Sequence, residues 1–143
     1  MMTEQAYEDT YAVAKGWFDA LTHGQFDTAL GLLDPEVEWI NYTVVPGMND
    51  VMPWIGTYHG PQQVLETLQI FTGLVSVQRE ELVRLLVQGD EAAGVIHEQS
   101  VVKANGQPFE IEFIQWLTIR NGKIVRWKSY TDPSPIIVAL RGA

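Results

Sequence analysis

The sequence contains no cysteine, and this absence removes several kinds of chemistry at once. Without a thiol, the chain has no disulfide framework, no cysteine nucleophile and no cysteine ligand for a metal cluster. It is also poor in positive charge, with 9 Lys and Arg against 18 Asp and Glu and a formal net charge of −9. This excess repels nucleic acids and anionic membrane surfaces, so we expect neither as a partner. A small neutral or cationic ligand suits the charge better.

Long hydrophobic runs and targeting signals are missing as well. No stretch approaches the length that spans a membrane, and residues 1–6 lack a basic region leading into an apolar one. We therefore expect a cytoplasmic protein. The sequence also lacks a Gly-rich phosphate loop, a GxSxG elbow and a dinucleotide fingerprint, and its three histidines do not have HxH or HxxxH spacing. We expect neither a cofactor nor a metal ion.

What is present is the pattern of one folded domain. The length of 143 residues is enough for a single hydrophobic core, so we predict one domain over residues 1–143. In the first half, apolar residues recur at helical spacing and predict helices over residues 4–22, 26–33 and 61–72. Val37, Trp39 and Asn41 alternate with other residues and indicate a short strand between the second and third helices.

The second half has the pattern of a β-meander. Branched and aromatic residues dominate segments 75–87, 92–104, 109–119 and 123–131, and a short helix is predicted over 136–140. Asn105-Gly106 and Asn121-Gly122 are typical of two-residue hairpin turns. Helices in the first half and a meander in the second predict the α+β class, with three N-terminal helices packed on a curved, mostly antiparallel sheet.

The two predicted hairpins assign side chains to the two faces of the sheet. Two-residue turns place one set on the face toward the helices: Ile96, Glu98, Ser100, Ile111, Phe113, Gln115, Leu117, Tyr130 and Asp132. This set mixes large apolar groups with a few polar ones, as ligand cavities do. The other face receives Val95, His97, Gln99, Glu112, Ile114, Trp116, Val125 and Trp127. Its tryptophans make it too apolar for a solvated face, which predicts a homodimer interface, although a one-residue bulge would reverse part of the assignment.

Two carboxylates on the inner face are candidates for acid–base chemistry. Apolar surroundings raise the pKa of a carboxyl group toward useful values, and Glu98 and Asp132 both lie on the predicted cavity face. Asp132 has an alternative role as a helix cap or Asx turn, because Pro133-Ser134-Pro135 follows it. For Glu98 the alternative is an ion pair across the sheet with Lys128 or Arg126.

Aromatic and histidine side chains supply further candidates for the ligand site. Trp17, Trp39, Trp54, Tyr58 and Phe71 are predicted to wall an aromatic cavity, with ordinary core packing as the alternative. The segment 43–60 is broken by Pro and Gly, which predicts a cover over the cavity mouth that orders when ligand binds.

The three histidines have different expected places. His59, in the irregular segment 43–60, is the one expected to contact ligand, although a lone loop histidine is usually just solvated. His23 lies at a helix end, where it caps the helix, and His97 falls on the outer sheet face.

Three stretches of the chain resemble one known family. They are Trp17 to Leu21 continuing through Gly24 to Trp39, the run Tyr58-His59-Gly60-Pro61-Gln62-Gln63-Val64, and the closing run from Asn121 to Asp132. In content and order they are similar to the SnoaL-like branch of the nuclear-transport-factor-two-like superfamily. The resemblance covers nearly the whole chain, and its motifs specify the fold better than the reaction. It implies a conical α+β barrel with a deep cavity, commonly dimeric through the outer sheet face.

The resemblance also implies roles for some residues. SnoaL-type polyketide cyclases use an acid–base aspartate near the end of the last strand, which Asp132 matches, but their histidine is replaced here by Gln115. Limonene-epoxide-hydrolase-like enzymes hold water with an aspartate, an asparagine and a tyrosine. Asp132 and Asn41 match the first two, Trp39 replaces the tyrosine and Glu98 stands in for a second acid. Ketosteroid isomerase activity is disfavoured, because Trp39 and Trp17 occupy the positions of its base and oxyanion tyrosine.

These patterns predict a cofactor-independent enzyme that acts on a small, largely hydrophobic molecule by acid–base catalysis. Asp132 is the expected base and Glu98 the assisting acid, while Asn41 and Gln115 orient the reacting group. The expected substrate contacts are Trp17, Trp39, Trp54, Tyr58, His59, Phe71, Phe113, Gln115 and Tyr130. The alternative is a non-catalytic small-ligand-binding or dimerisation domain of the same fold.

Overall fold

The structure, a computed structural model, describes residues 4–142 and contains four helices within them. They are α1 (Glu4–Thr22), α2 (Phe26–Leu30), α3 (Gly60–Leu74) and α4 (Ser134–Arg141). The predicted bounds of α1 are confirmed, and α3 is one or two residues longer at each end than predicted. The second helix was predicted to reach Leu33, but Leu33 begins a strand and pairs with Ile124. Pairing with the sheet outweighs the helical spacing of this segment.

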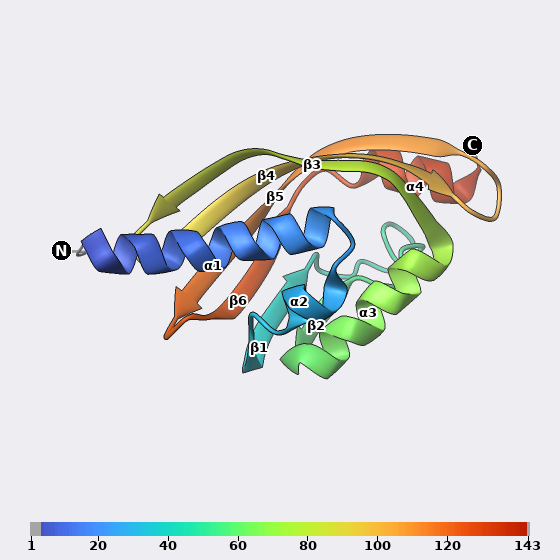
Figure 1. The fold of residues 1–143 in the computed structure, drawn as a ribbon. Helices are drawn as coiled ribbons and strands as arrows, with labels where there is room; N and C mark the ends of the chain where they lie inside the picture. The colour runs from blue at the N-terminus through green and yellow to red at the C-terminus, as the bar shows by residue number, and fades with distance from the viewer. Residues whose placement is uncertain (1–3, 143) are drawn as a thin grey trace.

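A six-stranded sheet forms the other layer of the molecule. Its strands are β1 (Leu33–Asn41), β2 (Gly56–His59), β3 (Val75–Gln88), β4 (Glu91–Val102), β5 (Pro108–Arg120) and β6 (Lys123–Tyr130). They lie in the order β2-β1-β6-β5-β4-β3, and only β1 and β6 run parallel within the described chain. Figure 1 shows the sheet curving over α1 and α3. The predicted fold class, helices on a curved and mostly antiparallel sheet, is confirmed.

Helix α1 packs very closely on the concave face of the sheet. Trp17 and Phe18, on the inner side of this helix, are both fully buried. The Phe18 ring lies against Gly94 of β4, and a Cβ atom built on Gly94 would come within 2.2 Å of the ring. Only glycine leaves room for this contact, since the ring is enclosed and has no space to move aside.

The hairpin between β4 and β5 has a different register from the predicted one, but its side chains lie on the predicted faces of the sheet. The turn spans residues 103–106, because Val102 N donates to Gln107 O, and Glu98 lies opposite Ile111 rather than Phe113. This register is shifted by two residues from the predicted one. Since side chains alternate with a period of two, the shift leaves every residue on its predicted face. Ile96, Glu98, Ser100, Ile111, Gln115 and Leu117 are all buried.

The hairpin between β5 and β6 contains a bulge that overturns part of the predicted assignment. Ile119 pairs with Ile124, but Thr118 pairs with Arg126, so Val125 is an extra residue on β6. Beyond this point each β6 side chain changes face. Trp127 is 3% exposed and lies inside, whereas Tyr130 is 46% exposed and lies outside. The predicted interface role of Trp127 and the predicted cavity role of Tyr130 are therefore wrong.

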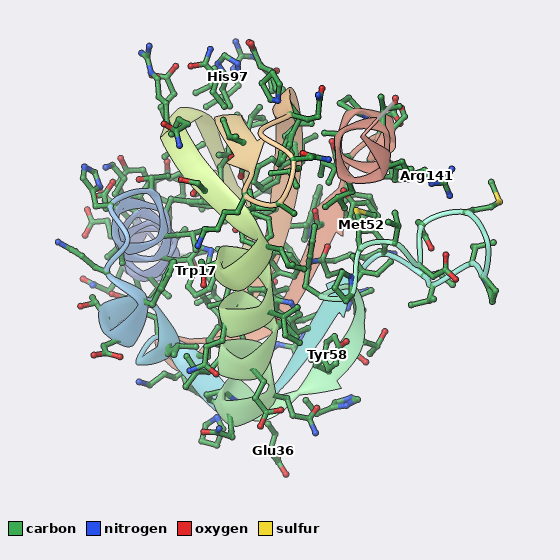
Figure 2. All side chains as sticks on the ribbon, turned by 90° about the vertical axis from the view of Figure 1, so that its right-hand side faces the viewer. Trp17, Glu36, Met52, Tyr58, His97 and Arg141 are labelled. Carbon is green, nitrogen blue, oxygen red and sulfur yellow. The ribbon has the colours of Figure 1, made fainter. Side chains whose placement is uncertain are left out.

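The irregular segment before α3 is partly buried rather than a free loop. Its residues Met52, Trp54 and Ile55 are buried together with residues of α4, and its end forms β2. Arg141 reaches from α4 toward the segment, as Figure 2 shows, and donates to the carbonyl oxygens of Gly47 and Met48. Separately, none of the helices in residues 4–142 has the length and apolar character needed to cross a membrane.

Candidate active site

A cavity of about 410 Å³ lies between the concave sheet face, the end of α1, α3 and the segment before β2. Its lining includes seven of the residues predicted from the sequence: Trp39, Asn41, Trp54, Phe71, Glu98, Phe113 and Gln115. The lining contains no lysine or arginine among the residues that the structure describes. A mostly apolar wall with a few polar groups is typical of sites for small molecules.

Three tryptophans form one end of the cavity and its support. Trp39 of β1 and Trp127 of β6 are neighbours in the sheet, and their rings stack at a centroid distance of 3.7 Å with an interplanar angle of 3°. Trp17 of α1 meets Trp39 edge-on at 5.9 Å. Trp17 does not line the cavity but lies directly behind the lining, between α1 and α3 in Figure 2. This cluster makes one wall rigid and aromatic.

The Gln115 side chain is held by two of these indoles. Trp17 Nε1 and Trp127 Nε1 each donate to Gln115 Oε1 at 2.9 Å. An indole nitrogen is only a donor, so both bonds require the amide oxygen at this position and exclude the flipped amide. Gln115 itself is 3% exposed and lines the cavity. The amide nitrogen must therefore face away from the two indoles.

Two glutamates from neighbouring strands form a carboxyl pair at another part of the cavity wall. Glu98 of β4 is 4% exposed, and Glu80 is its direct partner on β3. Both line the cavity, and their carboxyl groups are hydrogen-bonded to each other. Ser100 Oγ donates to Glu98 Oε2 at 2.9 Å. The alternative of an ion pair is wrong, because Arg126 bonds to Glu38 and the Lys128 ammonium lies over the Tyr130 ring.

The carboxyl pair holds a proton at neutral pH. Burial raises the pKa of Glu80 to about 9, and the hydrogen bond to Glu98 and its negative charge act in the same direction. Two adjacent carboxyl groups, one buried and one half-buried, cannot both ionise without strong repulsion, so one proton is shared between them. The pair can then both donate and accept a hydrogen bond toward the cavity.

Replacing Glu80 by Gln is expected to change how stability depends on pH. The pKa of Glu80 is near 4.5 in an unfolded chain and about 9 in the fold, so the folded state binds more protons between these values. The unfolding free energy of the wild type should therefore fall relative to Glu80→Gln as pH rises from 5 to 9, by at most about 1.4 kcal/mol per pH unit. Urea denaturation at several pH values measures this difference, and parallel curves would contradict a shared proton.

Tyr42 is a further group in the cavity wall beside the carboxyl pair. It follows β1 directly and has a φ of 62°, which is rare for a bulky residue. Burial raises the pKa of Tyr42 well above its usual value, and the charges of Glu98 and Asp132 add to the shift. The hydroxyl therefore stays protonated. Strained backbone of this kind is concentrated at functional sites, where the surrounding structure maintains it.

Four predicted site residues besides Trp17 lie outside the cavity lining. Tyr58 donates to Ile55 O at 2.7 Å, and His59 is exposed just before α3. Tyr130 is on the outer face. Asp132 is exposed, and it accepts hydrogen bonds from the hydroxyl and the backbone nitrogen of Ser134, which lower its pKa. This is the Asx turn that the sequence offered as the alternative role for Asp132.

The remaining histidines lie where the sequence predicted. The His23 ring is hydrogen-bonded to Asp19 O at 2.7 Å at the end of α1, which confirms its capping role. His97 is on the sheet face away from the helices, as Figure 2 shows, and its ring is within 2.6 Å of Glu110. Among residues 4–142 no group of three His, Asp or Glu side chains has the geometry of a metal site.

Sequence reasoning missed three of the groups just described: Glu80, Tyr42 and the inward Trp127. Irregularities in the pairing of β3 with β4 hide the alternation that would have placed Glu80. Tyr42 lies just past the strand end, where alternation no longer predicts direction. Counting back from the short turn between β3 and β4 would pair Glu98 with Glu81, and the irregularity between Leu82 and Arg84 places Glu80 there instead.

A profile of SnoaL-like domains matches residues 14–127. No curated protein matches the sequence. Among solved structures, an NTF2-like protein from Burkholderia xenovorans LB400 has 22% identity and a TM-score of 0.76 over 94% of this chain and 97% of that one.

Two further structures are similar at lower identity. TerC, crystallised with polyporic acid, has 18% identity and a TM-score of 0.78 over 93% of this chain and 98% of its own. An LEH-like epoxide hydrolase of M. tuberculosis has 15% identity and a TM-score of 0.67, covering 95% of this chain and 92% of its own. At such identities the likeness shows the fold alone.

Proposed function

Because the chain belongs to the SnoaL-like domain family, we propose that its cavity is the active site of a cofactor-independent acid–base enzyme. The substrate is a small, largely hydrophobic molecule, and the reaction is of the cyclase, isomerase or hydrolase type. The observation that carries this proposal is the hydrogen-bonded pair of Glu80 and Glu98 in a mostly apolar cavity. Two such carboxyl groups divide the roles of acid and base between them.

The pair has the protonation that such a reaction needs. In the proposed cycle Glu98 takes a proton from carbon or from an attacking water. Protonated Glu80 supplies a proton to the oxygen on which negative charge develops, so the proton count of the pair is restored in each cycle. Tyr42 and Asn41 line the same cavity and orient the reacting group.

Asp132, the base expected from the sequence, receives less support than the glutamate pair. Its carboxylate is exposed, lies outside the cavity lining and is bonded to Ser134, which lowers its pKa and weakens it as a base. A purely binding role for the domain is also less supported. An exposed single carboxylate would suit binding, whereas two hydrogen-bonded carboxyl groups in the cavity suit proton transfer.

The similar structures supply independent support for a small-molecule site. One is an epoxide hydrolase-like protein, and another was crystallised with polyporic acid. A panel of terpene epoxides, β-dicarbonyl compounds and enones therefore suits a first search for turnover. The proposal requires that any compound turned over by the wild type is no longer turned over at a comparable rate by Glu98→Gln. A Glu98→Gln variant that turns the compound over at the wild-type rate would contradict the proposal.

We also propose that the outer sheet face forms a homodimer interface. Ile114, Trp116 and Tyr130 are exposed on neighbouring strands there, and large apolar groups side by side favour association. Trp116→Glu is expected to convert a dimer into a monomer in sedimentation velocity at micromolar concentration. Tyr11→Glu is the matched control, because Tyr11 on α1 is an equally exposed aromatic residue away from the sheet. A wild-type monomer would remove the proposal.

A further inference from the structure

The Gln115 amide presents two hydrogen-bond donors to the cavity. Its oxygen is fixed by the two indoles, so its nitrogen points the other way. Within residues 4–142 this nitrogen has no hydrogen-bond partner, and it is not fully buried, since Trp39 Nε1 is the one unpartnered side-chain polar atom there that is fully buried. Gln115 Nε2 is therefore open to the cavity. A donor held in this way in a 3% exposed residue needs an acceptor from a ligand or from water.

The carboxyl pair lies at a distance from this donor along the same sheet face. Glu98 is opposite Ile111, and Gln115 is four residues further along β5. Four residues of a strand correspond to roughly 13 Å. Along β5 the residue between them on this face is Phe113, an apolar side chain that lines the cavity. The cavity therefore has a donor at one end, an apolar middle and a donor–acceptor pair at the other end.

We propose that the cavity binds an elongated neutral molecule with a carbonyl oxygen at one end and a hydroxyl group at the other. The carbonyl accepts from Gln115, the hydroxyl bonds to Glu80 and Glu98, and an aromatic or aliphatic body packs on Phe113. Each hydrogen bond spans about 3 Å, which leaves roughly 7 Å between the two ligand oxygens. An anionic ligand is disfavoured, because the described lining has no lysine or arginine, its basic side chain is His23 alone, and the carboxyl pair lies in the same wall.

This inference rests on the proposed function, since both use the same carboxyl pair, but it concerns recognition rather than turnover. The probe is 4-(4-hydroxyphenyl)butan-2-one, whose two oxygens have about the required separation. The compound 4-butylphenol lacks the carbonyl, and 4-phenylbutan-2-one lacks the hydroxyl. Titration calorimetry of the three compounds with the wild-type protein needs no variant that has to fold. Loss of either oxygen should weaken binding about tenfold, because each loss leaves a buried partner unpaired.

The variant Gln115→Leu tests whether the ligand carbonyl is bound by the Gln115 amide. In this variant the hydroxyketone and 4-butylphenol should bind within about twofold of each other, while loss of the hydroxyl still weakens binding about tenfold. Equal binding of the three compounds by the wild type would overturn the inference, as would no binding of the hydroxyketone at millimolar concentration. Binding is measured without turnover, so a failed acid–base role and a failed two-ended site give different results.

Discussion

Replacing Glu98 by Gln is expected to lower turnover by about 10²–10⁴-fold, which is the usual contribution of a positioned acid–base group. Gln has nearly the same shape and still accepts a hydrogen bond from Ser100, so the local packing should remain. It cannot accept a proton. The measurement is kcat/KM on any substrate found for the wild type, together with a thermal melt to show that the variant is folded.

The matched control is Asp132→Asn. Asn forms the same Asx turn to Ser134, and Asp132 is exposed. The unfolding equilibrium constant and kcat/KM should therefore each stay within about twofold of the wild-type value. The wild-type rate should also fall as pH rises through about 9, because Glu80 must keep its proton. A loss of a hundredfold or more in Asp132→Asn, with full turnover in Glu98→Gln, would return the base to Asp132.

Replacing Trp127 by Ala is expected to destabilise the fold by about 3–5 kcal/mol, the range measured for large aromatic residues in cores. The substitution removes the stack on Trp39 and one of the two donors to Gln115, and it opens a void beside the cavity. Guanidinium denaturation monitored by far-UV circular dichroism gives the unfolding free energy without depending on the tryptophan that is removed.

Arg126→Ala is the control for this prediction, because Arg126 is the neighbouring residue on the opposite face of β6. Its ion pair with Glu38 is about two-fifths exposed on each side, so its loss should cost no more than about 1 kcal/mol. A register without the Val125 bulge would place Arg126 opposite Leu117 and move Trp127 outside. A costly Arg126→Ala together with a mild Trp127→Ala would therefore contradict the bulge.

The elements of this fold follow from the sequence because they depend on local periodicity. Apolar spacing gave the bounds of α1, and the clusters of branched residues located β3 to β6 to within a few residues. The faces of β4 and β5 were also predictable, even with the wrong turn length, since a shift of two residues does not change the face. Glu98 and Gln115 were therefore assigned to the cavity face from the sequence alone.

The parts that could not be predicted depend on single-residue irregularities. The bulge at Val125 carries no glycine or proline to mark it, yet it reverses Trp127 and Tyr130. Two irregularities in the pairing of β3 separate Glu80 from any simple alternation. The pairing of Glu80 with Glu98, which gives the site its proton, therefore depends on tertiary geometry and not on a motif. Asp132 matched the family pattern better than Glu98 did, but its carboxylate is exposed and not buried in the cavity wall.

The close contact between Phe18 and Gly94 has a consequence for the descent of this sequence. The Phe18 ring fills the space that a side chain at position 94 would occupy, so neither position is free to change while the other is kept. We expect the two positions to covary in an alignment of relatives that share α1 and β4. Lineages that retain a large aromatic residue at position 18 should retain glycine at 94, and alanine or serine at 94 should accompany a smaller residue at 18. Independent variation of the two positions would mean that α1 is seated differently in those relatives.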